Sequence, residues 1–242
     1  MGNDELQVYR GKDFVINDKI QIHQPTLGEI ADWGEQKYFS FVQSFTATPT
    51  DLKYILSLSG VDWNTISDYE LFLTRYKTFG KDLSAILFGH LNLAGFQIAV
   101  QKENDSVVLV DPASQAVIDR SIYEIITEYL RKTHRLEKNV ERAMNETTRQ
   151  VLLDEAREQY EASQDLRFHS VLLPLISALT NMEGFKYSWS TVWDMKINAF
   201  MDSVTSILHI KNADRLLTSG YSGFGIDLKK VSPKELIYFI TK

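Results

Sequence analysis

Hydrophobic residues in the first fifth of the chain follow the period of an α-helix. From residue 27 to residue 45 apolar side chains recur every few positions, with polar residues between them. This stripe predicts one amphipathic helix whose apolar face lies in the core. The residues expected on its buried side are Leu27, Ile30, Tyr38, Phe41, Val42 and Phe45.

Short sequences of the type Ser/Thr-x-x-Glu mark the expected helix starts. In such a capping box the hydroxyl accepts a hydrogen bond from a backbone amide three residues later, and the glutamate reaches back to the cap. Residues 26–29 precede the helix just described, and residues 67–70 precede a helix expected to end at Gly80. Residues 232–235 predict a short terminal helix with Pro233 at its first position.

Further helices are expected in the first half of the chain. Residues 51–59 form one, and Gly60 follows in a position that suits the left-handed cap that ends many helices. Residues 122–130 carry another amphipathic pattern.

Two regions switch to the short period of strands. Residues 14–17 and 20–24 flank Asp18 and Lys19 and predict a small hairpin. Between residues 96 and 118 short runs of β-branched and aromatic residues predict strands, with a polar turn at 103–105. The expected fold class is therefore α+β, predominantly α-helical with a small antiparallel β-hairpin or sheet.

The pattern predicts a boundary in the middle of the chain. From residue 131 to residue 167 acidic and basic side chains alternate and large apolar residues become rare, as in a solvated helix or helical hairpin. We therefore divide the chain into a helical region with an inserted β element (1–135), a charged helical connector (136–167) and a C-terminal helical region (168–242). The alternative is one interwoven domain.

The last region holds the widest apolar face. Residues 168–182 predict a buried helix that is kinked at Pro174, and residues 195–218 predict a long helix. Aromatic residues gather around the start of the second helix, where they either pack in the core or anchor a partner protein. The candidate partner-binding residues are Trp189, Trp193, Phe200, Met201 and Val204.

Composition narrows the possible classes of protein. The chain has 242 residues, of which 44% are hydrophobic and 24% charged, values that are ordinary for a folded protein. A formal net charge of −6 disfavours a dedicated nucleic-acid binder, which needs a basic face. The absence of cysteine excludes disulfides and thiolate chemistry and suits a reducing compartment.

Targeting signals are not evident. Residues 1–12 lack the apolar core of a signal peptide, and no window approaches the length of an apolar membrane span. We expect a cytoplasmic protein that binds no membrane.

Signatures of catalysis are likewise not evident. The histidines are scattered singly, no G-x-S-x-G elbow occurs, and the spacing of Gly220, Gly223 and Gly225 matches neither a P-loop nor a dinucleotide fingerprint. Paired carboxylates such as Asp154 and Glu155 lie among arginines on the charged helix, which suits solvated ion pairs. We expect no catalytic residue, no metal and no cofactor.

Several passages resemble proteins from the tail-morphogenesis gene clusters of bacteriophages and prophages of Gram-positive and gut bacteria. They are residues 22–30 (IHQPTLGEI), 172–177 (LLPLIS), 191–194 (TVWD) and 199–204 (AFMDSV). The resemblance implies a non-enzymatic tail assembly chaperone, which coats the hydrophobic tape measure protein and recruits tail tube subunits. It implies no role for individual residues.

Two other functions stay open at this point. One is a virion structural protein of the tail or baseplate, which the same resemblance accommodates. The other is an enzyme whose site is assembled from dispersed residues. The partners expected for the chaperone are the tape measure and tail tube proteins, with self-association of the chain as a further possibility.

Overall fold

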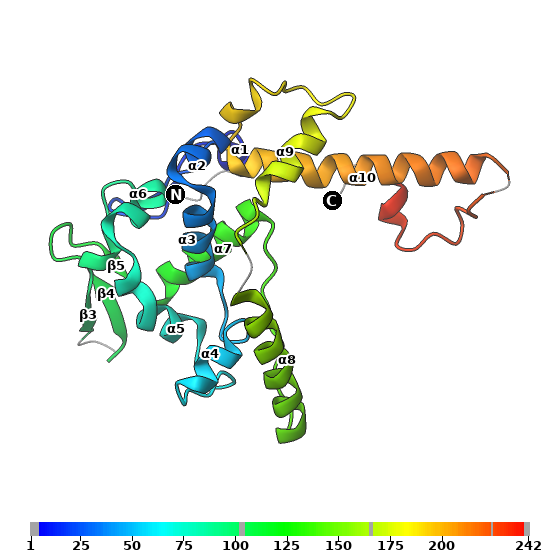
Figure 1. Cartoon of the computed structure of the whole chain (residues 1–242). Helices are drawn as coiled ribbons and strands as arrows, with labels where there is room; N and C mark the ends of the chain where they lie inside the picture. Colours follow the sequence, from blue (N-terminus) through cyan, green and yellow to red (C-terminus); the bar gives the residue numbers. More distant parts are fainter. Residues whose placement is uncertain (1–4, 102–104, 165–166, 224, 240–242) are drawn as a thin grey trace.

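The computed structural model describes residues 5–101, 105–164, 167–223 and 225–239 (Figure 1). Most of this part of the chain is helical. The α-helices are α1 (Glu5–Tyr9), α2 (Leu27–Trp33), α3 (Glu35–Thr46), α4 (Lys53–Leu58), α5 (Asp68–Arg75), α6 (Lys81–Phe88), α7 (Arg120–His134), α8 (Glu146–Gln164), α9 (Leu172–Thr180) and α10 (Ile197–Tyr221). The 3₁₀ turns are η1 (Tyr76–Thr78), η2 (Leu93–Gly95), η3 (Val192–Asp194) and η4 (Lys234–Ile237).

The strands form two small antiparallel sheets, as predicted. They are β1 (Phe14–Val15), β2 (Gln21–Ile22), β3 (Gln97–Val100), β4 (Val107–Val110) and β5 (Val117–Ile118). One sheet is the hairpin β1-β2, and the other has the order β3-β4-β5. The predicted fold class, predominantly helical α+β, is confirmed. The turn expected at 103–105 falls largely outside the described residues, which resume at Asp105.

The first predicted helix is interrupted, which corrects the expectation of one continuous element. Gly34 separates α2 from α3 and has a φ of 108°, a conformation that L side chains rarely adopt. Its amide still donates to the carbonyl of Ile30. The six apolar residues of the predicted stripe are nevertheless all buried, because both helices turn the same face to the core.

The end of another helix also differs from its predicted position. The helix that starts at the Ser67 cap ends at Arg75, and η1 follows before Gly80. Gly80 then precedes α6, an element that the sequence pattern did not predict. The capping boxes at Thr26 and Ser67 are both formed with their glutamates, as expected.

Aromatic rings fill the core beneath α3, α5 and α6. Phe45 lies at the centre, with its ring centroid 4.9 Å from that of Phe72 and 5.6 Å from those of Phe41 and Phe88. Phe79 completes the group. Such ring contacts add to the burial of apolar area, so this cluster holds the elements of the first half together.

Helix α7 is the central element of the molecule. It contacts α3, α5, β5 and α10, and its last residue, His134, is fully buried. The Nδ1 of His134 lies 2.7 Å from the carbonyl oxygen of Leu130, and its Nε2 lies 2.6 Å from the Tyr38 hydroxyl. A carbonyl can only accept, so Nδ1 carries the proton and Nε2 accepts from Tyr38. Burial lowers the pKa of His134 to about 4.

Helix α9 corrects the expected buried, kinked helix over 168–182. It begins only at Leu172, so Pro174 lies in its first turn, where a proline costs no hydrogen bond. Only one side of α9 is buried: Leu172, Ile176 and Leu179 face the core, whereas Leu173 is 63% exposed.

Two long helices extend from the body (Figure 1). The predicted helix over 195–218 is present as α10, and the residues after it fold back so that η4 packs on α10. The turn η4 replaces the predicted terminal α-helix, and the capping glutamate expected there, Glu235, has a side chain outside the described part of the structure. No described helix has both the length and the apolar character needed to cross a membrane.

Helix α8 is the second extension. Of its side chains only Leu152 is buried, in a small cluster with Leu56, Trp63 and Leu71. Residues 136–145, which lead into α8, have no regular secondary structure. The division of the chain into three regions stays a prediction.

Candidate partner-binding surfaces and a charged pocket

The five predicted partner-binding residues do not share one surface. Trp189 is 73% exposed, whereas Phe200 has no exposed surface and belongs to the main core. Trp193, Met201 and Val204 are half-buried and pack against that core. The apolar stripe at the start of α10 therefore holds this helix against the body.

The local backbone explains this burial. The segment before α10 is joined to the start of α2: the amide of Leu27 donates to the carbonyl of Met195, and the amide of Ile197 donates to that of Pro25, each at 2.9 Å. Gly28 allows the close approach, because a Cβ there would lie 3.2 Å from the Trp193 carbonyl oxygen. Hydrogen bonds between residues far apart in sequence thus place the first turn of α10 in the core.

Exposed apolar side chains are concentrated on α9 and on the segments directly before and after it. These residues are close in sequence, and we call them together the α9 surface: Phe168, Val171, Leu173, Tyr187 and Trp189. Ser188 stabilises the turn that carries Trp189, since its amide donates to the Thr191 hydroxyl at 2.9 Å. The sequence pattern identified Trp189 but missed Leu173, because the run from Val171 to Leu175 gives no sign of which side is buried.

The outer half of α10 has exposed apolar residues as well. Leu208 is 61% exposed, and Ile210 and Tyr221 are also largely accessible. The C-terminal segment covers a different side of this helix, where Ala213 is buried and the His209 ring lies 2.6 Å from the Tyr238 carbonyl. One side of the outer α10 is therefore covered by the chain itself, and Leu208 is left uncovered.

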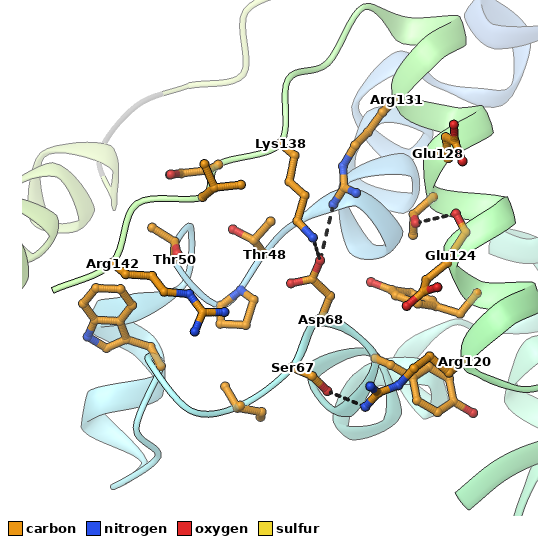
Figure 2. Close-up of a pocket in the computed structure, with 18 residues that line it drawn as sticks. Thr48, Thr50, Ser67, Asp68, Arg120, Glu124, Glu128, Arg131, Lys138 and Arg142 are labelled. Atoms are coloured by element: carbon orange, nitrogen blue, oxygen red, sulfur yellow. Dashed lines mark hydrogen bonds and ion pairs between the residues drawn. The ribbon is translucent and has the colours of Figure 1, made fainter. Parts of the chain in front are cut away.

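A charged pocket of about 440 Å³ lies between the start of α5, one side of α7 and the segment that leads into α8. Figure 2 shows Arg131 and Lys138 converging on Asp68, with Arg120 beside Ser67 and Arg142 on the opposite side near Thr50. The described residues that line it include four cations, Arg120, Arg131, Lys138 and Arg142, and three carboxylates, Asp68, Glu124 and Glu128.

Asp68 organises the interior of this pocket. Its Oδ2 lies 2.7 Å from Lys138 Nζ and 4.0 Å from Arg131 Nη2. Arg131 also donates to the Thr46 carbonyl at 2.6 Å. Arg120 and Arg142 form no ion pair with any described residue, and their contacts are the Ser67 hydroxyl at 3.4 Å and the Asn64 carbonyl at 3.3 Å.

The wall formed by residues 138–143 is attached to the body at several points. Glu141 accepts from Lys53 Nζ at 2.7 Å, and its carbonyl accepts from the Thr50 hydroxyl at 2.9 Å. Asn139 donates to Asp51 at 3.0 Å. The wall is thus held by contacts across about ninety residues of sequence, which no local pattern reveals.

A second, apolar pocket of about 510 Å³ lies between α1, α7 and the start of α10. Leu6, Tyr9 and Ile125 are among its lining residues. Ion pairs lie at its edge, with Lys132 2.6 Å from Glu5 and Arg135 2.6 Å from Asp202. Burial raises the pKa of Tyr9, whose hydroxyl donates to Asp202.

The described residues contain no group of three or more histidine, cysteine, aspartate or glutamate side chains arranged to hold a metal ion. The Nδ1 of His23 lies 2.9 Å from Asp13 Oδ1, and its Nε2 lies 3.5 Å from Glu29 Oε1. Comparisons of the chain with protein-family models, with curated proteins and with solved structures give no match.

Proposed function

We propose that this chain is a non-enzymatic assembly factor of a phage tail, a chaperone or adaptor that binds the tape measure and tail tube proteins in the cytoplasm. The resemblance of residues 22–30, 172–177, 191–194 and 199–204 to tail-morphogenesis proteins supports the setting. Two of these passages, 22–30 and 191–194, lie in segments that the fold joins through the Leu27 and Ile197 hydrogen bonds.

The observation that carries the proposal is the α9 surface. Five large apolar side chains are exposed there, within about twenty residues of sequence, and Trp189 is the most exposed of them. Tryptophan and tyrosine are the side chains that most often anchor protein interfaces, because each buries a large area at a small entropic cost. A tape measure protein is expected to offer apolar helical stripes, which are the complement of such a surface.

The outer half of α10 offers a second exposed apolar site. Leu208 lies on the side of α10 that continues the stripe of Phe200, which is buried, and Val204, which is half-buried, but no described element covers it. An amphipathic client helix placed along α10 would bury it. Exposed apolar residues that continue a core stripe are a common feature of surfaces that bind partners.

The test is capture of partners from the bacterium that encodes the chain, during expression of the neighbouring genes. The tagged protein is expected to recover a long helical protein of the tape-measure type, identified by mass spectrometry. A double variant, Leu173→Ala with Trp189→Ala, is expected to lose at least about 90% of that partner, since the pair supplies the most exposed anchors.

The matched control is Ile98→Ala with Val100→Ala. These side chains are similarly exposed on β3, away from the α9 surface, so the control removes apolar area without touching the proposed contact. Equal recovery of the partner by both double variants would contradict the proposal. Presence of the chain in finished particles would instead establish the virion structural protein.

A further inference from the structure

The charged pocket holds both buried side-chain nitrogen donors that have no acceptor among the described residues. They are Trp63 Nε1 and Arg131 Nε, and both residues line the pocket. Trp63 is only 2% exposed. Buried donors are nearly always satisfied in folded proteins, so these two nitrogens mark the wall of the pocket as a part of the body where polar groups are incompletely paired.

The arginines of the pocket indicate that it binds carboxylates. Arg120 and Arg142 lie on opposite sides of it and have no ion-pair partner in the described part of the chain. An arginine guanidinium pairs with a planar carboxylate through two parallel hydrogen bonds. Glu124 and Glu128 are exposed on the same lining, so the two arginines, and not the pocket as a whole, are the groups that attract carboxylates.

Helix α8 carries the matching groups. Its nineteen residues include five carboxylates and two arginines. Both arginines are already paired, Arg149 with Asp62 and Arg157 with Asp154, each at 3.3 Å. Glu155, Glu158 and Glu161 are exposed and form no ion pair with described residues. The outer half of α8 is therefore an acidic surface whose glutamates form no ion pair with the described part of its own chain.

The acidic half of α8 lies too far out to reach its own pocket. At the rise of an α-helix, residues 155–161 lie roughly 14 to 22 Å beyond the first residue of α8. Figure 1 shows this end standing away from the body. The hydrogen bonds of Glu141 and Asn139 hold the segment that leads into α8, which keeps the helix from folding back.

We propose that the pocket receives the acidic outer half of α8 from a second copy of this chain. The contact is head-to-tail, because the donor and acceptor surfaces lie on different parts of each copy, so copies can add in series. Arg120 and Arg142 pair with glutamates of the incoming α8. This contact uses no residue of the α9 surface and is independent of the proposed function.

The test is sedimentation velocity of the purified full chain over a range of concentrations, at about 0.1 M and about 1 M salt. Screening shortens from about 10 Å to about 3 Å between these conditions, so the self-association is expected at the lower salt and lost at the higher. A monomer at both salt concentrations, up to the highest concentration reached, would overturn the proposal.

Charge reversal locates the contact. Arg120→Glu with Arg142→Glu, or Glu158→Arg with Glu161→Arg, is expected to weaken self-association at least about tenfold, and combining all four changes is expected to restore it. The matched controls are Lys229→Glu with Lys230→Glu, and Asp18→Arg with Asp32→Arg, which change the net charge equally at exposed sites elsewhere. Failure of the fourfold variant to associate, while it keeps its helicity, would count against the contact.

A carbodiimide cross-link gives a direct readout. This reagent joins an amine to a carboxylate that touches it, so Lys138 is expected to couple to Glu155, Glu158 or Glu161. In a mixture of chains with light and heavy nitrogen, a contact between two copies must give coupled peptides that join a light partner to a heavy one, beside unmixed pairs. The proposed contact is contradicted if no mixed peptide joins Lys138 to α8, or if the mixed links from α8 reach only other lysines.

Discussion

Helices α7 and α8 follow one another in the chain and are similar in length, but they are stabilised in different ways. α7 has fifteen residues, of which seven are buried, and it contacts elements from both halves of the molecule. α8 has nineteen residues, of which one is buried. The first helix is held by tertiary packing, and the second by its own hydrogen bonds, a short contact with α4 and charged pairs on its surface.

This difference separates the regions that hold the fold from those that remain available for binding. The body around α7 buries its aromatic residues, whereas α8, α9 and the outer part of α10 leave large side chains or unpaired carboxylates exposed. Substitutions of buried side chains should therefore change stability, and substitutions of the exposed side chains on α8, α9 and the outer part of α10 should change association.

The largest effect is expected for Phe45→Ala. Phe45 has no exposed surface and contacts four other phenylalanine rings, so its truncation should cost about 3–5 kcal/mol of unfolding free energy. Leu208→Ala on α10 should cost less than about 0.5 kcal/mol, because Leu208 is already exposed. Urea denaturation of both variants checks this contrast, and similar losses would refute it.

Acid should destabilise the body through His134. Its pKa is about 4 in the folded protein, against 6.5 for an unperturbed histidine, so the unfolded chain binds a proton that the folded one does not. The contribution is complete above pH 6.5 and is lost as the pH falls toward 4, by about 3 kcal/mol in all.

The check is the unfolding free energy of the wild type and of His134→Gln between these pH values. Glutamine does not titrate, so the variant is expected to show a smaller slope against pH. Parallel slopes for the two proteins would show that His134 is not the group responsible.

The two sides of α8 should respond differently to the same kind of change. Leu152→Ala is expected to cost about 2 kcal/mol, because Leu152 is the buried contact with the Leu56 and Trp63 cluster. Its neighbour Val151 is half exposed, and Val151→Ala should lie within about 0.5 kcal/mol of wild type. Thermal unfolding followed by circular dichroism measures both losses of stability. Equal losses would contradict the packing of α8 on the body through Leu152.

The smallest of these stability effects concerns a helix cap. Thr26 accepts from the Glu29 amide at 3.1 Å, so Thr26→Ala should cost about 1 kcal/mol. Thr205→Ala is the control, because Thr205 lies exposed on α10 and caps no helix. Denaturant midpoints compare the two, and a neutral Thr26→Ala would mean that the capping box adds nothing to the stability of α2.

Local signals in the sequence predicted the features that depend on neighbouring residues. The capping boxes at Thr26 and Ser67 and the strand periods identified most elements correctly, since each involves residues a few positions apart. Boundaries were less predictable: Gly34 interrupts a continuous apolar stripe, and Pro174 lies in the first turn of α9 and not in the middle of a helix.

The candidate sites depended on contacts that no local pattern contains. Trp189 was recognised because it is aromatic, but the burial of Phe200 follows from the pairing of α10 with α2 and α7. Asp68 and Lys138 meet across seventy residues of sequence. A charged pocket of this kind is visible only once the fold has brought its walls together.

Hydrogen exchange of the chain, free and bound to the partner that it captures, tests most directly whether α8, α9 and the outer part of α10 bind partners. The outer halves of α8 and α10 and the segment around Trp189 are expected to exchange fastest in the free chain, and α7 slowest. Binding is expected to slow exchange at residues 168–190 and around Leu208, with no change in β3-β4-β5. Protection confined to the body, with the α9 surface unchanged, would contradict the claim that the extensions bind partners.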